Sequence, residues 1–368
     1  MPNHIKFFKD IKKSDVDIAG GKGASLGEMT SVGIPVPPGF VVLANAFDRF
    51  VEETHLKEEI EARLAEVDPE DTNTVDKASN VLRDVIHDTP MPEDLSKEIL
   101  ESFDELFSYD PTSILPLKRE EGQEMIDHST SILPLKREEG QVSPLFKEGN
   151  KGRFEFRVAV RSSATAEDGA IASWAGELDT FLNTTRENVL EKVRECWSSL
   201  FTPRAIFYRH EKGLIDAYVS VAVVIQKMVQ SEISGIAFTV HPVTEDPNQM
   251  IIEAGFGLGE AIVSGQITPD SYIISKDDMS IFDINIGCQT KQLKVKSQKS
   301  KVDGEANEWI DLSQSEGEKQ KLTGRQIMAV AEICQKIEQH YGFPCDIEWA
   351  IADEKIYVTQ SRPITTLK

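Results

Sequence analysis

Apolar residues recur three and four positions apart over the first third of the chain, with Asp, Glu and Lys between them. This spacing predicts amphipathic helices, because residues three and four apart lie on one face of a helix. A short apolar run at 40–43 follows a rigid segment rich in Pro and Gly, and it predicts a strand. The expected helices of this region are 22–32, 44–53, 56–66, 72–87 and 92–107.

The pattern changes further along the chain. Residues 154–161 alternate as a strand and lead into a polar turn at 162–168, and 186–200 predicts a helix. After residue 218 the sequence is dominated by short β-branched runs, which are typical of strands, with one helix at about 313–340. Helices that gather early and strands that gather late indicate an α+β architecture in two lobes. The expected late strands are 219–229, 235–240, 249–254, 270–275, 291–296, 345–351 and 355–360.

A repeat interrupts the first lobe. The twelve-residue sequence at 112–123 recurs letter for letter at 130–141. Each copy contains a Pro and a charged run, and neither offers an apolar face to bury. We therefore interpret 109–152 as an inserted, disordered loop, with a docking loop as the alternative. The expected organisation is a helix-rich first lobe at 1–108 and 153–217, the insertion at 109–152, and a strand-rich second lobe at 218–368.

Composition and charge narrow the class of protein. The chain has 368 residues, of which 40% are hydrophobic, so it is long enough to bury two or three cores. A net charge of −22 without a Lys/Arg cluster argues against a nucleic-acid partner. No segment approaches the roughly 18 apolar residues of a membrane span, and the start lacks a signal peptide's apolar core. We therefore expect a cytoplasmic protein without a membrane partner. The four cysteines form no C-x-x-C pair, which argues against a disulfide framework or a zinc site.

Two glycine-rich segments are candidates for binding phosphate. Residues Gly20–Ser25 precede a helix and would present backbone N–H groups and Lys22 to an anion. This segment lacks the Ser or Thr that follows the Lys of a Walker A loop, and a flexible turn is the alternative. Residues Gly255–Glu260 follow a strand, but Glu260 stands where a dinucleotide fingerprint has its third glycine. A tight phosphate-facing or structural loop explains this second segment better.

The last two predicted strands concentrate acidic, amide and basic groups. Asp346 and Glu348 lie two positions apart and face the same way, and a hairpin would place Gln360 and Arg362 beside them. Mg²⁺ prefers hard oxygen ligands, and the Arg guanidinium matches phosphate geometry. The group therefore predicts a Mg²⁺–polyphosphate site, with an exposed cross-strand ion pair as the alternative. Arg161 ends an apolar strand and has a similar alternative, as a solvated strand cap.

Eight segments together carry a family resemblance: Gly20–Glu28, Val36–Phe40, Val160–Asp168, Ala175–Asn183, Val224–Val229, Gly235–Thr239, Glu253–Glu260, and Asp346–Trp349 with Gln360–Pro363. In this order they resemble the nucleotide-binding module of the phosphoenolpyruvate synthase and pyruvate phosphate dikinase family. That family includes rifampicin phosphotransferase and phenylphosphate synthase. The resemblance covers nearly the whole chain outside the insertion. It implies a two-lobed ATP-grasp fold in which ATP lies between the lobes.

The resemblance also implies roles for individual residues. Three cations would hold and polarise the phosphates as catalytic groups, which is phosphoryl transfer by positioning and charge neutralisation. Three side chains with oxygen ligands would carry Mg²⁺, and further residues would bind the nucleotide. The implied cations are Lys22, Arg161 and Arg362; the metal ligands are Glu348 and Gln360, assisted by Asp346; the nucleotide contacts are Gly176, Thr180, Gln226, Lys227, Met228 and Val229, with Glu253 near the ribose or the metal.

Members of this family pass phosphate through a histidine within a T-x-x-x-S-H-x-x-I segment. None of the seven histidines stands in such a segment, and His241 is interpreted as structural. The resemblance therefore implies that the chain pyrophosphorylates or phosphorylates a histidine on another domain or subunit with ATP, and that AMP is released at the end of the cycle. The acceptor is left open among pyruvate, a phenol and an antibiotic. A non-catalytic nucleotide sensor and, more remotely, an NAD-binding enzyme are the alternatives.

Overall fold

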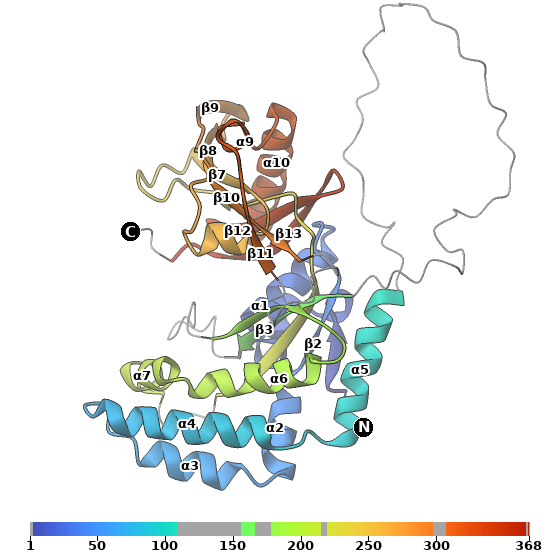
Figure 1. The fold of residues 1–368 in the computed structure, drawn as a ribbon, viewed down its shortest axis with the longest axis vertical. Helices are drawn as coiled ribbons and strands as arrows, with labels where there is room; N and C mark the ends of the chain where they lie inside the picture. The colour runs from blue at the N-terminus through green and yellow to red at the C-terminus, as the bar shows by residue number, and fades with distance from the viewer. Residues whose placement is uncertain are drawn as a thin grey trace, which may run out of the picture.

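The computed structural model describes residues 3–108, 156–165, 178–214, 219–296, 307–365 and 367 (Figure 1). The predicted insertion at 109–152 lies outside these residues. Within them, helices and strands are arranged around two antiparallel sheets, one in each lobe. The predicted α+β architecture in two lobes is confirmed.

The first sheet has five strands in the order β1-β2-β5-β3-β4. Its two faces differ because side chains alternate along each strand. Val160 and Val223 point into a core formed with the helices, whereas Arg161 and Gln226 lie on the opposite face. This alternation directs the polar side chains towards the second lobe. The strands are β1 (Ile5–Phe7), β2 (Gly39–Val42), β3 (Val158–Ala164), β4 (Thr180–Thr184) and β5 (Val221–Lys227).

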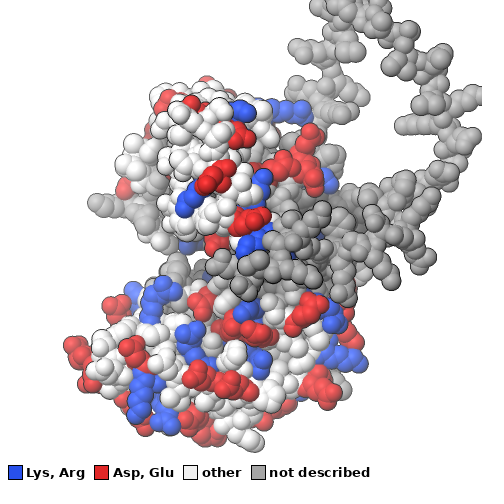
Figure 2. Space-filling model, in the orientation of Figure 1, with Lys and Arg blue, Asp and Glu red and all other residues white. Residues whose placement is uncertain are grey.

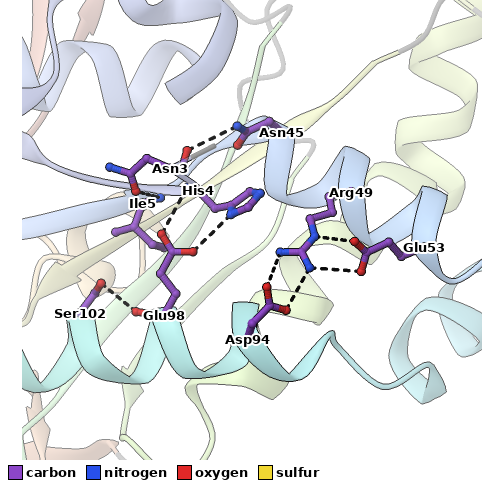
Figure 3. A network of polar contacts seen from close by, with 9 residues as sticks. All are labelled: Asn3, His4, Ile5, Asn45, Arg49, Glu53, Asp94, Glu98 and Ser102. Atoms are coloured by element: carbon purple, nitrogen blue, oxygen red, sulfur yellow. Dashed lines mark hydrogen bonds and ion pairs between the residues drawn. The ribbon is translucent and has the colours of Figure 1, made fainter. Parts of the chain in front are cut away.

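Six helices accompany this sheet, and several of them share its buried core. Trp197 is fully buried and packs its ring against Phe47 and Phe50. Glu98 accepts a hydrogen bond from His4, and Arg49 pairs with Glu53 and Asp94, so polar contacts tie the helices together at the rim (Figure 3). The helices are α2 (Ala44–Glu53), α3 (Lys57–Ala65), α4 (Thr72–Asp88), α5 (Glu93–Ser108), α6 (Val189–Ser198) and α7 (Pro203–Glu211).

The second sheet has six strands in the order β13-β12-β6-β7-β8-β9. Helix α10 (Gly324–Tyr341) covers one face of it, with Ile327 and Ile337 in a core shared with Ile252 and Ile347. A separate hairpin and two short helices complete the lobe. The remaining elements are β6 (Ile233–Phe238), β7 (Gln249–Phe256), β8 (Asp270–Ser275), β9 (Ser280–Asn285), β10 (Lys291–Val295), β11 (Asn307–Asp311), β12 (Cys345–Ala352), β13 (Lys355–Pro363), α8 (Glu260–Val263) and α9 (Gln314–Gly317).

Helix α1 (Val16–Ser31) joins the two lobes. Its Leu26 and Met29 are buried in one continuous core with Val224 of the first sheet and Ile347 of the second. The helix is kinked at Gly20, whose φ of +67° lies in the region that glycine tolerates best. Figure 1 shows α1 between the helical layer and the second sheet.

Of the elements expected from the sequence, most agree with the structure within two residues at both ends, including all of α2 and β8. Helix α1 begins before the expected residue 22, β3 and α6 begin after the expected residues 154 and 186, and β13 continues beyond residue 360. Three other expectations were wrong. Residues 162–164 continue β3 instead of forming a turn, the expected helix at 313–340 is divided into α9 and α10, and β5 pairs within the first sheet although it follows residue 218. Strands β1, β4, β9 and β11 and helix α7 were not predicted. Among the described residues, no helix is long and apolar enough to cross a membrane.

Candidate nucleotide-binding site

A cavity of about 1380 Å³ lies between the two lobes. Its wall combines the polar face of the first sheet, the start of α1 and the end of the β12–β13 hairpin. Most of the residues that the sequence singled out meet here, although they come from opposite ends of the chain. Those that line the cavity are Lys22, Arg161, Thr180, Gln226, Lys227, Met228, Val229, Asp346, Glu348, Gln360 and Arg362.

The β12–β13 hairpin pairs the predicted polar residues directly across two strands. Asp346 stands opposite Arg362, and Glu348 stands opposite Gln360. Asp346 Oδ2 accepts from Arg362 Nε at 2.9 Å and lies 2.8 Å from Arg362 Nη2. Since residues two apart share a face of a strand, all four side chains lie on one side of the hairpin. The predicted cross-strand grouping is therefore present, and part of it is an ion pair.

Arg161 reaches this hairpin from the first lobe. Its Nη1 donates to the Thr359 carbonyl oxygen at 3.1 Å, and its Nη2 donates to Gln360 Oε1. The same Nη2 lies 3.7 Å from Glu348 Oε2, and the side chain is 12% exposed. The buried Arg161 Nε has no hydrogen-bond partner among the described residues. Arg161 is thus a contact between the lobes and not a solvated strand cap.

The glycine-rich start of α1 is fixed against β3. A Cβ at Gly20 would collide with Ser163. Ser163 Oγ donates to the Ala19 carbonyl at 3.1 Å and accepts from the Gly23 N–H at 3.3 Å. This packing holds Lys22, which lines the cavity, at the N-terminal end of the helix that restarts after the kink. An anion in the cavity would meet a positive side chain and a positive helix end together. The flexible-turn alternative does not fit this anchored backbone.

The segment that leaves β5 forms another wall of the cavity. Gln226 is buried, and its Nε2 has no hydrogen-bond partner among the described residues. Lys227 N–H donates to the Pro38 carbonyl at 2.9 Å, and Met228 N–H donates to the Arg157 carbonyl at 3.0 Å. Burial lowers the pKa of the Lys227 ammonium group. An amide donor without a partner at the wall suits a ligand that brings a hydrogen-bond acceptor.

Comparison with known proteins identifies the family. Residues 16–115 and 139–368 match the family described as the pyruvate phosphate dikinase AMP/ATP-binding domain. The chain belongs to this family. The match omits 116–138, which lies within the repeat-bearing segment. The family resemblance drawn from the eight sequence segments is confirmed.

Curated relatives of this AMP/ATP-binding domain match almost the whole chain. The probable phosphoenolpyruvate synthase of Methanocaldococcus jannaschii is 41% identical over 99% of the chain and 27% of its own length. The phosphoenolpyruvate synthase of Pyrococcus furiosus is 42% identical over 99% of the chain and 44% of its own length. The rifampicin phosphotransferase of Bacillus cereus is 34% identical over 100% of the chain and 36% of its own length. The chain thus spans less than half the length of each of these relatives.

Two predicted site residues of the AMP/ATP-binding domain are not among those that line the cavity. Gly176 lies outside the described residues. Glu253 lies in β7, separated from Glu348 by Ile236 in one cross-strand row of the second sheet. Burial raises the pKa of the Glu253 carboxyl group. Glu253 therefore shares a face of the sheet with Glu348 but does not lie on the β12–β13 hairpin.

Sequence reasoning missed several residues at the ends of the cavity. Lys13 lies 5.2 Å from the centre of the Tyr341 ring, and both residues line the cavity. Glu260 lines it from the start of α8. The glycine segment next to Glu260 was a usable signal, whereas Lys13 and Tyr341 are 328 positions apart in the sequence and no local pattern joins them.

A group of potential metal ligands lies outside the cavity. His87, Glu191 and Glu195 place one ligand atom each within 4.8 Å of the others. Lys192 already occupies the space between the carboxylates, because its Nζ lies 3.2 Å from Glu191 and 2.8 Å from Glu195. The ammonium group forms ion pairs with both acids, so we interpret the group as an ion-pair network.

Proposed function

We propose that this chain is the ATP-binding module of a phosphoenolpyruvate synthase-like phosphotransferase. In this function it transfers phosphate from Mg-ATP to a histidine on another domain or subunit. The observation that carries the proposal is the contact of Arg161 with the Glu348–Gln360 pair inside the interlobe cavity. A guanidinium group, a carboxylate and an amide oxygen at one point suit a polyphosphate with its metal ion.

The residues present fit Mg²⁺. Glu348 and Gln360 offer hard oxygen atoms on neighbouring strands, and both of these oxygens now face the cationic Arg161. A positive charge therefore suits this position, and Asp346 adds a second carboxylate beside it. Glu348 and Gln360 would hold the ion, with Asp346 in support. When bound, Mg²⁺ neutralises phosphate charge and orients the phosphate chain.

The chain's own cations would act on the phosphates. Lys22 from α1, Arg161 from β3 and Arg362 from β13 line one cavity. Fixed positive groups stabilise the charge of a transferring phosphoryl group without reorganising during the reaction. Gln226, with its unpartnered amide, and the segment 227–229 would lie along the adenine, and Thr180 would complete the nucleotide wall. This arrangement positions ATP and needs no covalent intermediate on these side chains.

The phosphate acceptor in this proposal is a histidine on a carrier domain or subunit, and pyruvate receives the phosphate from that carrier. Two of the relatives named above are phosphoenolpyruvate synthases, which favours pyruvate over the antibiotic of rifampicin phosphotransferase. Figure 2 shows Lys and Arg side chains interspersed with Asp and Glu over the first lobe, and this mixed surface suits a protein partner better than a nucleic acid. We place the protein in the cytoplasm, where ATP and pyruvate are available.

Calorimetric titration with ATP, with and without Mg²⁺, tests the proposal. Glu348→Ala should abolish the Mg²⁺-dependent part of binding. The matched control is Asp283→Ala, which removes an exposed carboxylate from β9 of the same sheet and should leave binding unchanged. Equal Mg-ATP affinity in Glu348→Ala and the unmodified chain would contradict the metal assignment.

Transfer of label from β- and γ-labelled ATP tests the division of labour. The chain alone should bind ATP with little turnover. A histidine-bearing carrier domain from a phosphoenolpyruvate synthase should then accept the β- and γ-phosphates of ATP as a pyrophosphoryl group, with release of AMP. Water should take the terminal phosphate as inorganic phosphate, and pyruvate should accept the phosphoryl group that remains on the histidine. Rapid phosphorylation of a small acceptor by the chain alone, with ADP as product, would point instead to a self-contained kinase.

A further inference from the structure

The β10–β11 hairpin and the glycine segment 255–259 form one structural unit. Leu258 and Ala261 pack with Leu293 of β10 in a small core of their own. Leu258 N–H donates to the Leu293 carbonyl at 2.9 Å, and Gly257 pairs with Leu293 as a β-bridge. Gly257 has φ +92°, and a Cβ there would collide with the Leu293 backbone. Movement of the hairpin would therefore carry the cavity-lining residues Leu258 and Glu260 with it.

A chain of side-chain hydrogen bonds links this unit to the first lobe. Asn183 Nδ2 on β4 donates to Asn307 Oδ1 at 2.7 Å, and Asn307 Nδ2 donates to Glu260 Oε2 at 3.3 Å. Asn183 is 5% exposed and has φ +56°, a conformation that Asn adopts more readily than most residues. Glu260 lines the cavity. We call Asn183, Asn307 and Glu260 the asparagine clasp.

The carboxylate of Glu260 fixes the direction of the clasp. An ionised carboxylate only accepts hydrogen bonds, so Asn307 must turn its NH₂ group towards Glu260. Its oxygen then faces Asn183, which must donate in turn. Each amide therefore has one orientation that allows both hydrogen bonds to form. Substitutions can reverse the direction in which these hydrogen bonds run.

The contacts along α1 hold the two lobes together in a different way. Along α1 the two lobes share an apolar core, and Ser25 Oγ donates to the Ser361 carbonyl at 3.0 Å. His340 Nε2 of α10 lies 2.8 Å from Glu28 Oε1 of α1. Separation of the lobes along α1 would expose apolar side chains, whereas breaking the clasp would expose polar groups that water can satisfy. Opening at the clasp therefore costs less free energy than separating the lobes along α1.

We propose that Asn183 and Asn307 are positioning residues that hold Glu260 and segment 255–259 over a nucleotide between the lobes and slow its dissociation. This inference rests on the proposed function, because it assumes that ATP binds in the cavity. Neither asparagine is among the residues that line the cavity. Both act through Glu260, which lines the cavity and accepts from Asn307.

A reversal of the clasp separates positioning from a general structural role. Asn183→Asp places an acceptor against the oxygen of Asn307. If Asn307 turns its amide to donate to that carboxylate, its oxygen then faces the Glu260 carboxylate. The double variant Asn183→Asp with Glu260→Gln restores a continuous chain that runs in the opposite direction and keeps the charge of the unmodified clasp. Glu308→Ala, on β11 beside Asn307, is the matched control outside the clasp.

Two measurements are made on the full chain. Stopped-flow dissociation of a fluorescent ATP analogue with Mg²⁺ should be about tenfold faster in Asn183→Asp and in Asn307→Ala, as expected for one lost charge-assisted hydrogen bond. The dissociation rate of the double variant should return to within about threefold of the rate of the unmodified chain. The rate of Glu308→Ala should equal that of the unmodified chain. Without nucleotide, amide hydrogen exchange of 255–263 and 291–295 should be faster in Asn183→Asp and restored in the double variant.

The outcomes distinguish failure of the positioning role from failure of the proposed function. Unmodified dissociation rates in Asn183→Asp and Asn307→Ala, or a double variant as fast as Asn183→Asp, would overturn the positioning role. If the unmodified chain fails to bind the ATP analogue, the proposed function falls and the positioning role falls with it. The exchange measurement then decides the clasp by itself, because unchanged exchange in Asn183→Asp would show that the contact does not hold segment 255–263.

Discussion

Replacement of Arg161 by Met tests how much one side chain contributes to the contact between the lobes and, in the proposed function, to phosphate transfer. Methionine keeps most of the apolar stem but removes the donors to the Thr359 carbonyl and Gln360 Oε1, and the charge near Glu348. Hydrogen bonds from a charged group contribute about 1.5–3 kcal/mol when the partner is left unsatisfied. Because Glu348 is 26% exposed, water compensates part of the loss. We expect the free energy of unfolding in urea to fall by about 2 kcal/mol.

The effect on function should exceed the effect on folding. A fixed cation that acts on transferring phosphate typically contributes on the order of 10²–10³ in rate. Arg161→Met should therefore lose phosphate transfer to a histidine-bearing carrier by that factor under conditions where it is fully folded. Arg161→Lys should recover only part of it, because one ammonium group does not span two acceptors as the guanidinium fork does. Arg63→Met, which removes exposed ion pairs on α3, is the control. Unchanged stability together with unchanged transfer in Arg161→Met would refute the reasoning.

Three further predictions follow from particular residues. Gly20→Ala should lower the melting temperature and weaken ATP binding, because its Cβ would meet Ser163 at φ +67°; thermal melts and titrations at wild-type level would contradict the anchored-helix argument. Glu253→Gln should raise the free energy of unfolding at pH 7, because burial raises the carboxyl pKa above the 4.5 of the exposed group and ionisation destabilises the fold. The gain should vanish below pH 4.5, and a stability difference that does not change with pH would exclude this cause. Replacement of 112–151 by a short Gly/Ser linker should leave urea unfolding and ATP affinity nearly unchanged, and aggregation of the shortened chain would show a structural role.

The sequence predicted best those elements whose hydrophobic pattern lies within the element itself. Helix α4 was predicted within one residue, because the spacing of its apolar residues is a local signal. The structure adds that Asp71 caps the helix by accepting from the Asn73 N–H. The β12–β13 hairpin was predicted with its polar face, because side-chain alternation alone places Asp346 with Glu348. Strand β9 was not predicted, because its sequence lacks such a pattern. It is an edge strand with exposed Phe282 and Ile284, and its pattern lacks a buried face.

The contacts within the site could not be predicted without the three-dimensional fold. The sequence could propose Arg161 and Gln360 separately, but it could not show that a strand-end arginine crosses to a hairpin 199 positions later. The contact between Arg161 and Gln360 depends on the position of β5 in the first sheet. The apolar run of β5, however, resembles the runs of the later strands. Sheet membership depends on long-range pairing, which local patterns do not encode.

In the proposed function, the positions of the three cations would couple phosphate binding to the approach of the two lobes. Lys22 lies on α1, which packs against both lobes, Arg161 lies on β3 of the first lobe, and Arg362 lies on the hairpin of the second lobe. If all three cations came from one lobe, an open cavity would hold phosphate as firmly as a closed one. Because the charge is divided, the full positive field exists only when the hairpin and β3 approach, as the Arg161–Gln360 contact shows they do here. Arg161 contacts Glu348 and Gln360, and its charge offsets that of the Glu348 carboxylate. With a polyphosphate in the cavity, Arg161 would donate to phosphate oxygens, and Glu348 and Gln360 would be the residues that hold Mg²⁺. The same side chain would thus support the unliganded lobe contact and the loaded site, which is why its removal should affect both stability and transfer.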